Sequence, residues 1–164
     1  MPDIGDEQAY LNAEDFDTSV RRLAEAKAAA VAKICPDSLV LGADTIVVCD
    51  GQALGKPRNR EDAGRMLRLL SGREHTVCSG VALACQDASV MESMSERTSV
   101  VFRPIVDLEI QEYLATGEGE DKAGAYGIQG QAMLFVAQIH GCYYNVVGLP
   151  VQPTIQLLRK YSCC

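Results

Sequence analysis

The stretch SLVLGADTIVVCDGQALGKP, residues 38–57, decides the fold. Its first half, SLVLGADTIVV, is an apolar run rich in β-branched residues, which predicts a buried central strand. Asp50-Gly51 follows as the strongest short hairpin signal in the chain, and QALG is the return strand that runs into Lys56-Pro57. Because a two-residue turn pairs Thr45 opposite Lys56, we expect Lys56 to lie close to Asp44.

Helices and strands alternate on both sides of this hairpin. Helical spacing of apolar residues predicts a helix over 18–35 with Thr18 as its N-cap, a second helix capped by Asn59, and a third capped by Asp107. Strands are predicted over 75–85 and 97–103, separated by a polar loop, and over AMLFVAQI (132–139), and Pro153 opens a short last helix. The order favours an α/β fold, with a mixed, twisted sheet flanked by helices, and a single domain over residues 1–164.

Composition excludes several classes of protein. The formal net charge of −7 argues against nucleic-acid binding, since a phosphate backbone selects for clustered Lys and Arg. No apolar run approaches the eighteen residues of a membrane span, and the N-terminus lacks the pattern of a signal peptide, so we expect a cytoplasmic protein. The seven cysteines include no C-x-x-C pair, and only His75 and His140 could join them, which favours reduced thiols over disulfides or a zinc site.

Asp44 is an anomaly, because a carboxylate inside an apolar strand loses hydration unless a cation compensates. In the functional interpretation, Asp44 lies at a cleft as a metal ligand or general base. In the alternative, Gly42 loosens the strand and lets Asp44 reach a backbone donor.

Two further features stand out. Lys27 falls on the apolar stripe of the first helix, where it either snorkels to solvent or points into a polar cleft. The glycine-rich segment DKAGAYGIQG (121–130) allows close approach to a ligand, with Lys122 and Gln129 as recognition groups. Three lysines and a placed carboxylate suit a triphosphate held with a divalent metal.

Four segments together resemble the signature motifs of the Maf family, in the order in which that family has them. They are GADTIVVCDGQALGKP, LSGREHTV followed by SGVAL, DKAGAYGIQG and YYNVVGLP, and the likeness runs from about Ile4 to Leu158. The resemblance implies a Maf/ITPase-like α/β fold and hydrolysis of nucleoside triphosphates to the monophosphate and pyrophosphate.

The resemblance also implies roles for individual residues. Asp44 matches the catalytic aspartate of the GADT motif, and Thr45 matches a specificity position beside it. Lys56 matches the lysine of the G-K-P motif, and Lys27 that of LAEAKA. Gln129 matches the glutamine of G-I-Q-G, which is typical of the branch that cleaves dTTP and UTP.

The metal site and the N-terminus complete the expectations. Glu7 matches an acidic residue near the metal, which is Mg²⁺ or Mn²⁺, so Glu7 and Asp44 are its expected ligands. The family begins with a strand and a segment like S-A-S-P-R-R, and this sequence has no such segment, which corresponds to a missing first strand and helix. We therefore keep an alternative, a catalytically weakened nucleotide-binding or regulatory protein. The expected partner is the nucleoside triphosphate, with no nucleic acid and no membrane, and a homodimer is an open alternative.

Overall fold

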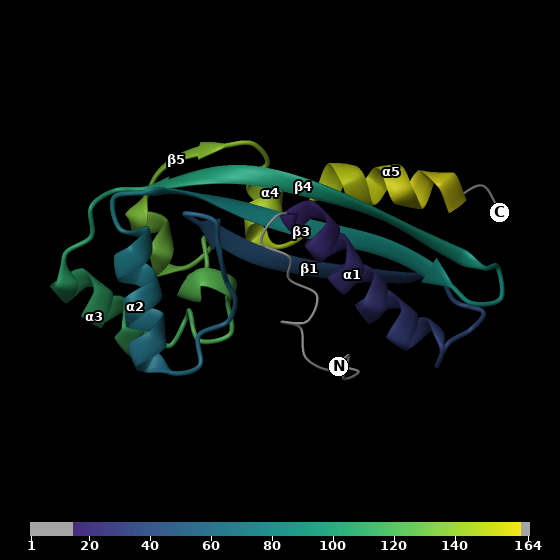
Figure 1. Ribbon diagram of the computed structural model, residues 1–164, viewed down its shortest axis with the longest axis horizontal. Helices are drawn as coiled ribbons and strands as arrows, with labels where there is room; N and C mark the ends of the chain where they lie inside the picture. The colour runs from purple at the N-terminus through teal and green to yellow at the C-terminus, as the bar shows by residue number, and fades with distance from the viewer. Residues whose placement is uncertain (1–14, 162–164) are drawn as a thin grey trace. The chain divides into compact units, whose positions relative to one another are not determined.

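The computed structural model describes residues 15–161 of the chain (Figure 1). In chain order the elements are α1 (Phe16–Ala32), β1 (Val40–Cys49), β2 (Gln52–Leu54), α2 (Arg60–Leu70), β3 (Glu74–Cys85), β4 (Val90–Phe102), α3 (Asp107–Thr116), the short 3-10 helices η2 (Ala123–Ala125) and η3 (Gln131–Phe135), β5 (Val136–His140), α4 (Tyr143–Val147) and α5 (Val151–Tyr161). Among the described helices, none has both the length and the apolar composition needed to cross a bilayer.

The strands form one five-stranded sheet in the order β2-β1-β3-β4-β5, which confirms the α/β fold with a sheet flanked by helices. The pairs β1–β2 and β4–β5 are antiparallel. The neighbours β3 and β4 are joined by residues 86–89 alone, which is too short for the crossover that a parallel pair needs. The sequence predicted a mixed sheet, whereas these three neighbouring pairs are all antiparallel.

The described residues fall into two compact units. The first contains the described residues up to Thr45, Cys78–Glu96 and the chain from Gly148 on, and the second contains Ile46–Val77 and Arg97–Val147. The strands β1, β3 and β4 contribute residues to both units.

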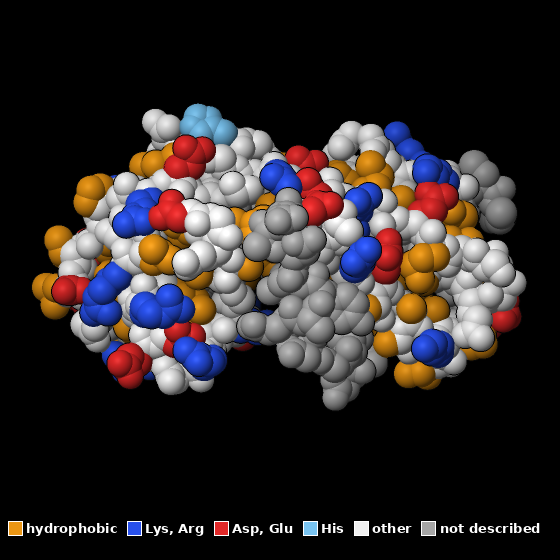
Figure 2. All heavy atoms as spheres, in the orientation of Figure 1, with side chains coloured by type: hydrophobic (Ala, Val, Ile, Leu, Met, Phe, Trp, Pro, Cys, Tyr) orange, Lys and Arg blue, Asp and Glu red, His pale blue; other side chains and the backbone are white. Residues whose placement is uncertain are grey.

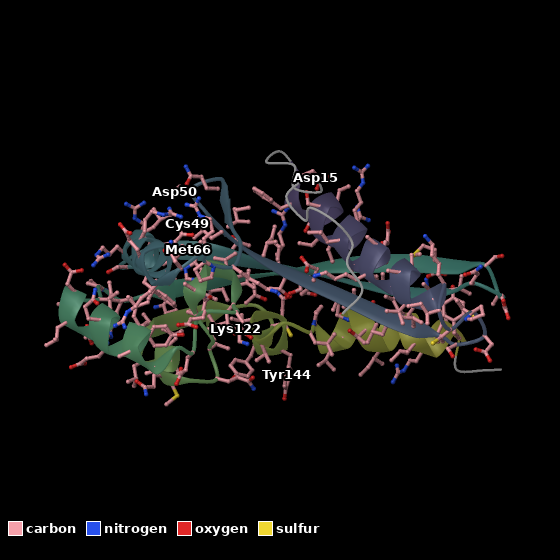
Figure 3. The ribbon with its side chains drawn as sticks, turned by 90° about the horizontal axis from the view of Figure 1, so that it is seen from below. Asp15, Cys49, Asp50, Met66, Lys122 and Tyr144 are labelled. Atoms are coloured by element: carbon pink, nitrogen blue, oxygen red, sulfur yellow. The ribbon has the colours of Figure 1, made fainter. Side chains whose placement is uncertain are left out.

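In the first unit, α1 and α5 cover opposite faces of β3. Alanines of α1 pack against Ala82 and Ala84, whereas Leu157 of α5 packs against Val81 and Leu83. Alternate residues of a strand point to opposite faces, so these two sets identify the two sides of the sheet. Figures 1 and 3 show the two helices on opposite sides of the strands. Burial on both faces explains why this part of β3 is almost continuously apolar.

Two glycines let α1 lie directly on the strand backbones. A Cβ at Gly42 of β1 would stand 2.4 Å from the carbonyl oxygen of Ala24, and one at Gly80 of β3 would stand 2.2 Å from that of Val20. Both distances are far below van der Waals contact, so a side chain at either position would push the helix away. Glycine at these two positions therefore sets the packing distance between α1 and the strands, and with it the position of Lys27.

The second unit has the larger apolar core. The end of β1, the start of β3, α2, α3 and the 3-10 helices enclose Phe102, Tyr113, Tyr126 and Phe135, whose rings meet edge to face. The α2 helix begins as predicted, because the side chain of Asn59 accepts a hydrogen bond from the Asp62 backbone N–H.

Several predicted boundaries are wrong. Asp15, whose side chain accepts from the Thr18 backbone N–H, is the N-cap of α1, so Thr18 lies inside the helix. Asp107 is the first helical residue of α3, and the cap position is Val106. Most of the expected loop between β3 and β4 belongs to β4, which begins at Val90, and the run at 132–139 starts as η3 and becomes β5 only at Val136.

Candidate active site

Lys27 and Asp44 form an ion pair inside the first unit. The Lys27 Nζ donates a hydrogen bond to Asp44 Oδ1, and the two side chains are only 13% and 11% exposed. Lys27 therefore points into the protein, and the interpretation in which it snorkels to solvent is wrong. The pair also explains the carboxylate in an apolar strand, because the lysine supplies the compensating cation.

Asp44 and Thr45 face opposite sides of β1. Gly42 and Asp44 lie on the face that α1 covers, whereas Ala43 packs with the α5 cluster on the other face. Thr45 shares that second face: its hydroxyl lies 2.8 Å from the Ser79 hydroxyl, and it donates to the Gly148 carbonyl over 3.4 Å. A strand places successive side chains on opposite faces, so Asp44 and Thr45, which are neighbours in the GADT motif, point to opposite sides of the sheet.

The predicted hairpin register is confirmed. Cys49 pairs with Gln52 and Val47 with Leu54, as a two-residue Asp50-Gly51 turn requires. The β2 strand ends at Leu54, so Thr45 and Lys56 are not partners in the ladder. Lys56 is exposed and belongs to the second unit, whereas Asp44 belongs to the first. Their predicted proximity stays a prediction.

Lys56 and Lys122 lie on joined segments of the second unit. The Gly124 backbone N–H donates to the Gly55 carbonyl over 3.1 Å, which ties the glycine-rich loop to the segment before Lys56. The pKa of Asp121 is lowered, chiefly by the hydrogen bond from Lys122 and to a smaller degree by the charge of Lys56. Two cationic side chains therefore act on one region of this unit, where an anionic group would be stabilised.

The glycine-rich loop presents Lys122 and Gln129 to solvent. Gly124, Ala125, Tyr126 and Ile128 are buried between them. Figure 3 labels Lys122 on this loop, and its Nζ lies 2.9 Å from Asp121 Oδ2. A loop whose backbone is packed and whose polar side chains are exposed is suited to recognition.

The arginines around α2 are a second candidate for binding a polyanion, and like Lys122 they are paired with carboxylates. Figure 2 shows blue side chains interleaved with red ones over this part of the second unit. Arg65 pairs with Asp62, Arg68 with Asp107, and Arg73 with Asp50. Each of these cations already has an acidic partner, which reduces the field available to a phosphate.

Sequence reasoning missed Ser79, His75 and Tyr126. Ser79 is fully buried in β3 and contacts Thr45, and its signal was a hydroxyl inside an apolar strand, the same kind of anomaly as Asp44. His75 was considered only as a zinc ligand, and in the structure its Nε2 lies 2.8 Å from the Tyr126 hydroxyl. Only the fold could reveal that pair, because the two residues are far apart in the sequence.

The described cysteines agree with the expectation of reduced thiols. Cys35, Cys49, Cys78, Cys85 and Cys142 are free. The pKa of the Cys49 thiol is raised, mainly by burial, so Cys49 stays protonated and behaves as a small apolar residue.

Of the two expected metal ligands, Asp44 lies among the described residues. Glu7 lies outside the described residues. Within residues 15–161, no group of three or more His, Cys, Asp or Glu side chains is arranged to hold an ion. Mg²⁺ in phosphate enzymes is commonly held by one or two carboxylates together with substrate phosphates, so Asp44 is a donor of the right kind.

Comparison with known proteins identifies the family. The family model described as "Maf-like protein" matches residues 2–161. Three similar proteins are each named dTTP/UTP pyrophosphatase. That of Symbiobacterium thermophilum is 50% identical over 99% of this chain and 81% of its own length. That of Moorella thermoacetica is 53% identical over 87% of this chain and 74% of its own length, and that of Pelotomaculum thermopropionicum is 49% identical over 87% and 75%. The predicted Maf likeness is confirmed, and the chain belongs to the Maf family.

Proposed function

We propose that this chain is a nucleoside-triphosphate pyrophosphatase that prefers dTTP and UTP and releases the monophosphate and pyrophosphate. Its relatives, about half of whose residues are identical to this chain, carry the name of that activity. The observation that carries the proposal is the buried Lys27–Asp44 pair. Buried ionisable groups with a specific charge partner cluster at functional sites, and Asp44 lies in the GADT motif.

In the proposed reaction, Asp44 accepts a proton from the water that attacks the α-phosphorus. The bond from that phosphorus to the bridging oxygen then breaks, and pyrophosphate leaves with the electron pair. Lys27 orients Asp44 through its hydrogen bond to Oδ1. Lys56 and Lys122 stabilise the negative charge that develops on the leaving group.

A divalent metal is part of the proposal. Asp44 and Glu7 would hold Mg²⁺ or Mn²⁺, which when bound supplies neutralising charge for the phosphates.

Gln129 and Thr45 are the proposed specificity residues. The base of dTTP or UTP carries two carbonyl oxygens that flank an N3–H donor. A glutamine amide has both an acceptor and a donor, so Gln129 can pair with adjacent groups on that edge. Cytosine lacks the N3–H, and the same amide would face an unpaired or clashing group. Gln129 is exposed on its loop, where a ligand can reach it.

A pyrophosphate-release assay over a panel of nucleoside triphosphates tests the proposal, with Asp44→Asn as the matched variant. Asparagine keeps the shape of the side chain but loses the charge, so activity should fall at least a hundredfold, on the order of a lost general base. Circular dichroism confirms that the variant is folded. Turnover of dTTP at the wild-type rate by folded Asp44→Asn would refute the role of Asp44. Binding of nucleotide without turnover by the wild-type chain would instead support the weakened, regulatory alternative.

A further inference from the structure

The glycine-rich loop of the second unit is fixed by directional contacts as well as by apolar packing. Its backbone is left-handed at Gly124 and Ala125, with φ of 69° and 60°. The Gly127 backbone N–H donates to the Tyr113 hydroxyl over 3.2 Å. These contacts lie within five residues of Gln129 in the sequence, so they constrain the backbone from which Gln129 projects.

Tyr126 and His75 form the most deeply buried of these contacts. The Tyr126 hydroxyl and His75 Nε2 are 2.8 Å apart, and the residues are 5% and 2% exposed. Burial lowers the pKa of His75 to about 4 and raises the pKa of Tyr126, so both groups are neutral near pH 7. The contact is therefore a hydrogen bond between two uncharged groups.

Apolar packing alone does not account for this pair. Phe102 meets both rings edge to face, with centroids 4.8 Å from each, so the surroundings are those of an aromatic core. Two apolar rings would fill the same space without the cost of burying a hydroxyl and an imidazole. What the polar pair adds is direction, because a hydrogen bond fixes the position of the Tyr126 hydroxyl and hence of the chain that follows it.

We propose that His75 and Tyr126 are positioning residues for Gln129, and that their hydrogen bond sets the selectivity for a pyrimidine 2,4-dione over cytosine. This inference rests on the proposed function and deepens it. Tyr126 precedes Gln129 by three residues, with Ile128 buried between them, so a shift at Tyr126 is carried along a short, packed segment. A bidentate amide contact tolerates little displacement, whereas Lys122 of the same loop acts on the leaving group as a point charge, whose effect depends less on exact position.

The test compares Tyr126→Phe and His75→Leu with the wild-type chain. Each removes the hydrogen bond and keeps a residue suited to an apolar core. We expect the KM for dTTP to rise about fivefold and the ratio of kcat/KM for dTTP over CTP to fall about fivefold, the size of one neutral hydrogen bond. The kcat for dTTP should stay within about twofold, because the catalytic carboxylate is untouched.

Three matched variants separate positioning from general destabilisation. His75→Gln retains a polar atom near the position of Nε2 and should restore the dTTP preference. Phe102→Leu weakens the packing around the pair without removing either polar group, and should lower the melting temperature while leaving the preference unchanged. Tyr161→Phe removes a hydroxyl that donates a hydrogen bond to Glu92 in the first unit. It should change neither the KM for dTTP nor the preference for dTTP over CTP.

Hydrogen–deuterium exchange provides a measurement that does not need turnover. Tyr126→Phe should speed exchange at the amides of residues 127–130 at least fivefold, and Tyr161→Phe should not. If folded Tyr126→Phe and His75→Leu keep both the wild-type dTTP preference and wild-type exchange in the loop, the inference is wrong. It is equally wrong if Phe102→Leu reduces the preference as much as they do. If the wild-type chain releases no pyrophosphate from any nucleotide, the proposed function is wrong. The hydrogen–deuterium exchange result then tests by itself whether the His75–Tyr126 hydrogen bond anchors the loop.

Discussion

Lys27 is the ammonium partner of the Asp44 carboxylate inside β1. Lys27→Met keeps the length and apolar contacts of the side chain but leaves Asp44 without its ammonium partner, so we expect the free energy of unfolding to fall by about 2–4 kcal/mol. Urea denaturation followed by circular dichroism measures the change. The double variant Lys27→Met/Asp44→Asn removes both charges and should regain part of the loss. If the loss in the double variant equals the sum of the losses in the two single variants, the two side chains do not stabilise each other.

His75 predicts how stability depends on pH. Its folded-state pKa is about 4, below the ordinary value of 6.5, because burial disfavours the charged ring. The unfolded chain therefore binds a proton first as pH falls, so the stability contribution is complete above pH 6.5 and is lost between pH 6.5 and pH 4. The loss amounts to about 3 kcal/mol.

His75→Gln, which cannot titrate, provides the control. Its free energy of unfolding should vary less over this interval than that of the wild-type chain, with carboxylates contributing equally to both. Parallel curves for the two proteins would contradict the assignment.

At the scale of elements, the close contact between α1 and the sheet is the feature most sensitive to substitution. Gly80→Ala places a Cβ against the Val20 carbonyl, so α1 must move and carry Lys27 with it. We expect a loss of at least about 2 kcal/mol in stability, typical of overpacking against backbone, and a loss of activity of at least about tenfold.

Gly64→Ala is the matched control, since its Cβ would meet only side-chain ends, those of Arg68 and Leu114, and alanine favours a helix. Thermal unfolding of both variants checks the prediction. Equal melting temperatures for Gly80→Ala and the wild-type chain would show that the helix can shift without cost.

The elements that sequence predicted best are those whose signals are local. The Asn59 cap and the Asp50-Gly51 turn depend on a few neighbouring residues, and both are confirmed. The start of β4 could not be predicted, because MESMSERTS is partly exposed and its polar residues resemble a loop until pairing with β3 makes them a strand. In η3, Ala132 and Phe135 are buried three residues apart, a spacing that an apolar run alone does not reveal.

The candidate site was predictable where one residue was chemically out of place. Asp44 in an apolar strand and Lys27 on an apolar stripe each indicated a partner, and the structure shows that they are partners of each other. Ser79 and the His75–Tyr126 pair needed the sheet and the loop, because their partners come from distant segments. The predicted proximity of Lys56 to Asp44 depended on extending a ladder that ends at Leu54.

Charge at the scale of the whole molecule predicts that activity requires a divalent metal. The chain carries a net charge of −7 and its proposed substrate is a polyanion, so long-range electrostatics oppose binding. Lys122 is paired with Asp121, which leaves part of the substrate charge to be neutralised by a cation. We expect EDTA to lower pyrophosphate release by at least about a hundredfold, on the order of several kcal/mol of lost charge stabilisation, and Mn²⁺ or Mg²⁺ to restore it.

Titration calorimetry with Mn²⁺ alone then distinguishes the two roles proposed for Asp44. If Asp44 is a metal ligand, Asp44→Asn should weaken Mn²⁺ binding by at least about tenfold, because an amide oxygen carries no charge. If Asp44 acts only as a base, the variant should bind Mn²⁺ as the wild-type chain does and lose turnover alone. Full activity of the EDTA-treated protein would remove the metal from the proposal and leave the lysines as the sole source of positive charge at the phosphates.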